Sequence, residues 1–149
     1  MQVSKIRQRM LLLLHVFPVL GVILACSPER KPCSVVVSFL AVDTSMHSSR
    51  IPEIVWQTIS YDSTFLHELN DCVNWKKAPD FFCNAGTLVE IVYSDSSKIN
   101  FEASLECNTP FARPLGRKRL TRLIPKGIAM NKFREWHDSI KLKDGWVFF

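Results

Sequence analysis

The stretch that decides the fold is TLVEIVYSDSSKINFEASLEC, residues 87 to 107. From Ile99 to Cys107, apolar and polar residues alternate without interruption, a period of two that is typical of a strand with one buried face. Residues 87 to 93 are rich in β-branched and apolar side chains, and the polar run 94 to 97 between the two segments suits a turn. The stretch therefore predicts an antiparallel hairpin.

Two further strands are expected before this hairpin. Residues 35 to 42 form a nearly unbroken apolar and β-branched run, which is typical of a strand buried on both faces. Residues 54 to 61 are also rich in β-branched and aromatic residues and predict a second strand. The polar residues 43 to 50 between them are expected to form a loop.

Helical periodicity appears twice. Apolar residues recur at helical spacing after Asp62 or Ser63, either of which is a suitable N-cap, and predict a helix ending near Trp75, before Pro79. A second amphipathic pattern predicts a helix over residues 129 to 141.

The remaining C-terminal segments complete the expected fold. Residues 108 to 114 are rich in turn-forming residues and are expected to interrupt the regular secondary structure. The terminal run 146 to 149 is expected to pair as a strand or to dock in the core, because an exposed apolar edge favours aggregation. We therefore predict an α+β fold, an antiparallel sheet with helices near 63 to 75 and 129 to 141 on one face.

The N-terminus is typical of an export signal. Lys5, Arg7 and Arg9 precede an apolar run from residue 10 to residue 25, without any acidic residue. A membrane-spanning helix needs about 20 apolar residues, and this run is shorter and contains Pro18. We therefore expect residues 1 to 25 to be a cleaved signal peptide.

The end of this run, Ile23-Leu24-Ala25-Cys26, resembles the lipobox of bacterial lipoproteins. The resemblance implies diacylation of Cys26, and Ser27 after it implies the outer membrane, with the protein facing the periplasm. The alternative is an ordinary signal peptide with Cys26 as a stray thiol or a disulfide partner. The first interpretation divides the chain into a signal peptide (1–25), a lipidated tether (26–34) and a single domain (35–149).

The cysteine count fits an oxidising compartment. Of five cysteines, removal of Cys26 leaves an even set of four, which predicts two disulfides. Four cysteines allow three pairings; we favour Cys72 with Cys83 and Cys33 with Cys107, because the first pair would join a helix end to a strand start. The alternative of a metal site lacks C-x-x-C spacing and suitably placed histidines, so we expect neither metal nor cofactor.

Charge is unevenly distributed. Residues 26 to 112 hold 6 Lys/Arg and 11 Asp/Glu, a balance of −5, whereas residues 113 to 149 hold 10 and 3, a balance of +7. Without the three charges of the signal, the mature chain carries about +2, so its basicity does not indicate nucleic-acid binding. Six positive residues lie between 113 and 126 without an acid, here called the basic segment: Arg113, Arg117, Lys118, Arg119, Arg122 and Lys126.

The basic segment is the main candidate for partner binding. Contiguous positive charge suits an acidic protein or anionic lipid headgroups, although it is also typical of a solvated face. Four tryptophans, at 56, 75, 136 and 146, could instead line a groove for carbohydrate or peptide, or could belong to the core.

Catalytic motifs are sparse in the sequence. It has no G-x-S-x-G, H-E-x-x-H, phosphate-binding glycine loop or calcium loop. Asp43, Ser45 and His47 could form a triad, a combination that chance supplies in any serine-rich loop. His67 with Asp71, and His137 with its acidic neighbours, are typical of surface pairs.

Two functional classes remain. We expect a membrane-anchored envelope lipoprotein that acts as a non-catalytic protein-binding module, inhibitor-like, immunity-like or assembly-assisting. The alternative is a small envelope hydrolase with an unrecognised site. The lack of a nucleophile or metal signature in the sequence favours the binding module.

Overall fold

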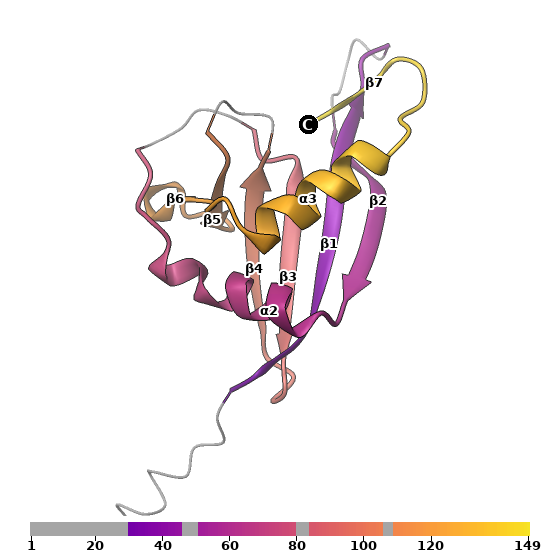
Figure 1. Cartoon of the computed structure of the whole chain (residues 1–149). Helices are drawn as coiled ribbons and strands as arrows, with labels where there is room; N and C mark the ends of the chain where they lie inside the picture. The colour runs from indigo at the N-terminus through magenta and orange to yellow at the C-terminus, as the bar shows by residue number, and fades with distance from the viewer. Residues whose placement is uncertain (1–29, 46–50, 80–83, 106–108) are drawn as a thin grey trace, which may run out of the picture. The chain divides into compact units, whose positions relative to one another are not determined.

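The strand with the most pairing partners is β1, Pro32–Asp43, in a computed structural model that describes residues 30–45, 51–79, 84–105 and 109–149. β1 pairs antiparallel with β2 (Glu53–Ser60), β3 (Thr87–Tyr93) and β7 (Trp146–Phe148), as Figure 1 shows. From Val35 to Val42 its residues are buried on both faces apart from the half-buried Val36, as the unbroken apolar run predicted, whereas Cys33 before them is exposed. The strand begins at Pro32, three residues before the predicted domain start, within the region expected to be a tether.

The predicted hairpin is confirmed. β3 pairs antiparallel with β4, Lys98–Ser104, and the register places Val89 opposite Phe101 and Ile91 opposite Ile99. Burial alternates along the whole of β3, and in β4 Phe101 is buried between less buried neighbours. The period of two therefore corresponds to burial throughout β3 and only in part of β4, where Ile99 is 39% exposed and Ser104 is buried.

Beyond β4 the sheet continues through two short strands. β5 is Phe111–Pro114 and β6 is Arg122–Leu123, and within the described residues the strand order is β2-β1-β3-β4-β5-β6, with β7 beside β1. The prediction of a break at 108 to 114 is therefore wrong over β5. The reason is that Phe111 and Ala112 are buried by pairing with β4, a contact that four residues flanked by prolines do not reveal through periodicity.

The two predicted helices are present. α2 spans Ser63–Asn70, and the Asp62 carboxylate caps it by accepting hydrogen bonds from the backbone N–H groups of Thr64 and Phe65 at 3.0 and 3.1 Å. The α-helix ends earlier than predicted, because residues 71 to 74 continue it as a 3₁₀ turn, η1. α3 spans Ile128–Ser139.

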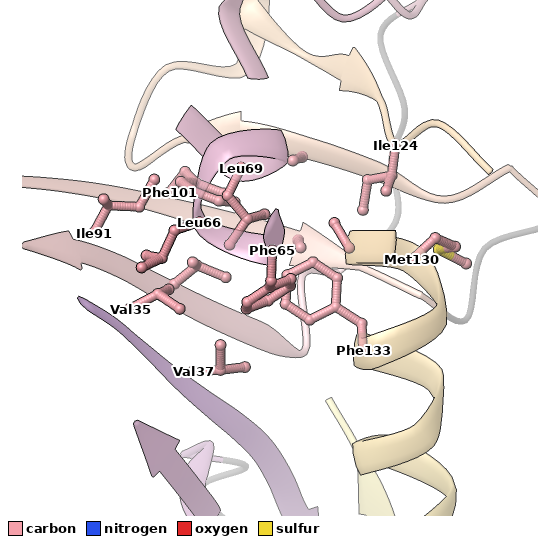
Figure 2. Close-up of a cluster of buried hydrophobic side chains, with 14 of the residues drawn as sticks. Val35, Val37, Phe65, Leu66, Leu69, Ile91, Phe101, Ile124, Met130 and Phe133 are labelled. Atoms are coloured by element: carbon pink, nitrogen blue, oxygen red, sulfur yellow. The ribbon is translucent and has the colours of Figure 1, made fainter. Parts of the chain in front are cut away.

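Both helices contribute to one apolar core on the same face of the sheet. Figure 2 shows α2 and α3 meeting over the sheet, where Phe65 and Phe133 contact at a centroid distance of 5.7 Å. Val35 and Val37 of β1 belong to the same buried cluster and lie on the sheet side of these two rings. The predicted architecture, an antiparallel α+β sheet with two helices on one face, is thus present, and residues 31 to 149 form one compact unit.

The start of α3 is held by α2. Gly127 at the N-cap of α3 has no side chain to accept a hydrogen bond, and Glu68 of α2 supplies the acceptor instead. Its Oε2 accepts a hydrogen bond from the backbone N–H of Ala129 at 2.7 Å. A Cβ at position 127 would overlap Glu68 Oε1, so a side chain there would displace the carboxylate that accepts from Ala129.

Among the described residues, no helix is both long enough and apolar enough to span a membrane. The predicted signal peptide, Cys26 and its lipidation lie outside the described residues.

Candidate functional site

An apolar pocket of about 200 Å³ lies beside the end of α2, on the helix-bearing side of the sheet. Its floor comes from β3 and β4, where Ile91 and Phe101 are buried and Ile99 is 39% exposed. These residues belong to the face that the helices cover further along the strands. The pocket is therefore an uncovered end of the core surface.

The walls of the pocket come from segments far apart in the sequence. On one side Asn70 is fixed by Tyr93, whose hydroxyl donates a hydrogen bond to Asn70 Oδ1 at 2.8 Å. On the other side stand β5 and the turn before β6, with Leu120 exposed at 42%. The lining residues are Asn70, Cys72, Ile91, Tyr93, Ile99, Asn100, Phe101, Ala112, Arg113, Pro114, Leu120 and Arg122.

Positive charge lies at this pocket. β6 is held to the chain after η1, because the backbone N–H of Leu123 donates to Lys76 O at 2.8 Å and that of Ala78 donates to Thr121 O at 3.0 Å. Lys77 and Arg122 form an antiparallel bridge between these hydrogen bonds. Bridge partners share a face, so the Lys77 side chain lies beside Arg122, which lines the pocket. The sequence did not single out Lys77, because a pair of lysines after a helix is common.

The six residues of the basic segment have different environments. Arg117, Arg119 and Lys126 are exposed and Arg122 is half-buried, whereas the side chain of Lys118 lies outside what the structure describes. Arg113 is 8% exposed and its Nε donates to Glu102 Oε1 across the β4–β5 pair. Its charge is thus compensated within the fold, and the exposed positive surface is formed by the later residues.

The tryptophans lie mainly against the core. Trp75 is 8% exposed, and Trp56 packs on Phe39 at 5.5 Å and on Trp136 at 5.9 Å between ring centroids. Trp146 pairs in β7 with Asp43 of β1. These contacts agree with the core-packing interpretation for the first three tryptophans.

Of the triad considered in the first polar loop, the described residues include Asp43 and Ser45, which are in contact. Asp43 Oδ1 accepts hydrogen bonds from the Ser45 hydroxyl at 2.6 Å and the Ser45 backbone N–H at 2.8 Å, while His47 lies outside the described residues. The two hydrogen bonds lower the pKa of the Asp43 carboxyl below its ordinary value. This arrangement is a turn motif that fixes the end of β1.

The two histidine pairs differ in exposure: the His67 side chain lies on the surface as expected, whereas the His137 side chain is only 24% exposed. His67 Nε2 and Asp71 Oδ2 are 3.7 Å apart, and the histidine side chain is 80% exposed, which agrees with a surface pair. His137 Nδ1 lies 3.3 Å from Asp138 Oδ1, and its ring packs on Phe148 at 4.0 Å between centroids.

The predicted disulfides each involve one cysteine outside the described residues. Cys33 is exposed and Cys72 is half-buried, and no disulfide joins these two to each other. Their predicted partners, Cys107 and Cys83, are not among the described residues, so both pairings stay predictions. In the same part of the chain, no group of three or more His, Cys, Asp or Glu side chains is arranged to hold a metal ion.

Comparison of the chain with protein-family models, with curated proteins and with solved structures found no match.

Proposed function

We propose that this chain is an envelope lipoprotein, anchored through Cys26, whose folded domain binds another protein without catalysing a reaction. The observation that carries the proposal is the apolar pocket of about 200 Å³ with Arg122 in its lining and Lys77 beside it. This combination suits a partner segment that inserts an apolar side chain and carries a carboxylate next to it. An inhibitor-like, immunity-like or assembly-assisting role is consistent with such capture.

Two physical effects would act together at this pocket. Apolar burial contributes roughly 25 cal/mol per Å² of surface removed from water, and the partly exposed lining residues Ile99 and Leu120 offer such surface. The guanidinium of Arg122 can form charge-assisted hydrogen bonds with a carboxylate. The exposed Arg117 and Arg119 would add long-range attraction for an acidic protein.

A small envelope hydrolase is the second candidate. A catalytic site needs a nucleophile or activated water beside a positioned base. The polar groups around the pocket are Asn70, Asn100, Cys72, the Tyr93 hydroxyl and the arginines, and no histidine or carboxylate is among its lining residues. This composition favours binding over catalysis.

The anchor is tested by membrane fractionation of cells that express the full chain or the Cys26→Ala variant. Wild type should sediment with the membranes and the variant should be exported but soluble, because the lipid is attached to that thiol. If the variant remains in the membrane after carbonate washing, the apolar N-terminus is itself the anchor.

The binding role is tested by capture from the native envelope with the tagged full chain. We compare Ile99→Gln, at the pocket floor, with Ile128→Gln, which is similarly exposed at 41% on α3 and does not line the pocket. A genuine partner should be captured by wild type and by Ile128→Gln, and lost from Ile99→Gln. Equal capture by all three proteins would exclude this pocket as the binding site.

A further inference from the structure

The outer edge of β2 carries an inference that does not depend on the proposed function. β2 pairs with β1 on one side, and among the described residues no strand covers its other side (Figure 1). It is eight residues long, and Glu53 is its one charged residue. Natural proteins usually protect such an edge with charged residues, proline or a β-bulge, since its free N–H and C=O groups invite another strand, and residues 56 to 60 of β2 contain none of these.

The hydrogen bonds of β1 determine which residues of β2 face outwards. The backbone N–H of Leu40 donates to Gly86 O at 2.7 Å, and its carbonyl oxygen accepts from Phe149 N at 3.0 Å. Both backbone groups of Leu40 therefore point away from β2. Backbone groups alternate in direction along a strand, so the N–H and C=O of its neighbour Phe39 point towards β2, where Phe39 is paired with Trp56. By the same alternation, Gln57 and Ile59 direct their backbone N–H and C=O groups to the open edge.

A β-bulge extends this pattern to Ile54. The register changes between two adjacent residues of β1: Phe39 pairs with Trp56, whereas Leu40 pairs with Ile54. Val55 therefore has no partner of its own and is the extra residue of the bulge. Ile54 consequently lies on the same face as Gln57 and Ile59, opposite the helices, and its backbone is also directed outwards.

Large apolar side chains accompany this edge. Ile54 and Ile59 are 55% and 54% exposed, and the flanking Ile51 and Tyr61 are 71% and 73% exposed. Isolated exposed apolar residues are common, but here two lie in the edge strand and two directly flank it, so apolar side chains are concentrated at this edge.

We infer that β2 pairs antiparallel with β2 of a second copy of this chain, with the two-fold axis at Gln57. Gln57 of each copy then exchanges two backbone hydrogen bonds with Gln57 of the other. Because of the bulge, Ile59 of one copy lies beside Ile54 of the other, on the face opposite the helices. Glu53 lies opposite Ser60, so no like charges meet.

The self-complementary order of the strand selects a second copy rather than a foreign peptide. Across a two-fold axis each residue lies opposite a residue from the other side of the centre in the second copy, so these two residues must be compatible. Ile54 and Ile59 meet this condition about Gln57, and the outward backbone groups are directed as the pairing requires. A foreign strand would need no such symmetry.

Cross-linking of the full chain tests the pairing. In a hydrogen-bonded pair the Cα atoms are about 5.5 Å apart, within the range of about 4.4–6.8 Å that a disulfide spans. After mild oxidation of extracts containing two differently tagged copies, Gln57→Cys should form at least tenfold more mixed-tag dimer than Asn100→Cys, after subtraction of the wild-type level. Asn100 is exposed on β4, three strands away in the same sheet.

A second substitution separates pairing from misfolding. Ile59→Lys in the Gln57→Cys background should abolish most of the dimer, since it places lysine beside an apolar side chain on both sides of the axis. Ile128→Lys on α3 should leave the dimer unchanged. Circular dichroism should show that both proteins are folded.

Three results decide the inference. A mixed-tag dimer that disappears with Ile59→Lys supports it. A disulfide from residue 57 to a different protein, or no excess over Asn100→Cys, overturns it. Sedimentation of the detergent-solubilised wild type gives an independent measurement, in which a monomer at all concentrations would also overturn it.

Discussion

At one edge of the sheet β6 carries Arg122 beside Lys77 and an apolar pocket, whereas at the other edge β2 carries Glu53 as its one charge. The first edge can attract an acidic partner over about a Debye length, roughly 8 Å at physiological ionic strength. The second offers backbone groups and apolar side chains, which act at contact. The same sheet therefore presents two edges: at one, binding would depend on charge, and at the other it would depend on shape and strand register.

The largest expected effect comes from the helical layer that both edges share. Phe65 is fully buried, and its ring lies 5.7 Å from Phe133 and 5.3 Å from Trp136, which in turn packs on Trp56 of β2. Phe65→Ala should lower the free energy of unfolding by about 3–5 kcal/mol through lost burial and a cavity. Urea unfolding measures this, with Tyr61→Ala, at an exposed aromatic, as the control.

The Phe65 substitution also tests whether the two edges are energetically joined. Hydrogen exchange should accelerate in β2 and in β5 together, because one core supports both. If β2 exchanged faster while β5 was unchanged, the two edges would belong to separate cooperative units.

A smaller effect is expected where α2 holds α3. Glu68→Ala removes the acceptor for the Ala129 N–H, and no side chain at the Gly127 N-cap can replace it. The free energy of unfolding should fall by about 1–2 kcal/mol. Glu135→Ala on the exposed part of α3 is the matched control and should change it by less than about 0.5 kcal/mol. Equal effects would show that the Glu68 contact does not stabilise the helix.

The sequence predicted the elements whose signal is local. Alternation from Ile99 onwards determined the hairpin and its buried face, and the carboxylate of Asp62 marked the start of α2. β5 and β6 were missed because two to four residues contain too little periodicity, and their pairing depends on β4. The shortened α2 reflects a 3₁₀ ending that apolar spacing does not distinguish from an α-helix.

The candidate site was predicted in part by composition. The absence of acids between residues 113 and 126 indicated a charged surface, and Arg117 and Arg119 are indeed exposed. The ion pair of Arg113 with Glu102 follows from the β4–β5 register, which sequence reasoning did not include. Lys77 and the pocket depend on contacts between distant segments, which no local pattern encodes.

The exposed charge of the basic segment gives the last expected effect. Replacing Arg117, Lys118 and Arg119 together by Glu should leave folding intact, because Arg117 and Arg119 are exposed. Affinity for the captured partner should fall about tenfold, equivalent to about 1.4 kcal/mol. The control of equal charge change, Lys132, Arg134 and Lys141 to Glu, lies on or after α3, away from the pocket lining, and should have a smaller effect.

The dependence on salt concentration distinguishes binding at the two edges in the same experiment. Association of wild type with its partner should slow as ionic strength rises, and the charge-reversed protein should lose this dependence, because screening weakens steering by exposed charges. Pairing through β2 should respond little to salt, since its contacts are backbone hydrogen bonds and isoleucine side chains. Association rates and dimer fractions measured from low to high salt provide the comparison. If partner binding were as insensitive to salt as dimer formation, the basic segment would be a solvated face and recognition would depend on the apolar pocket alone.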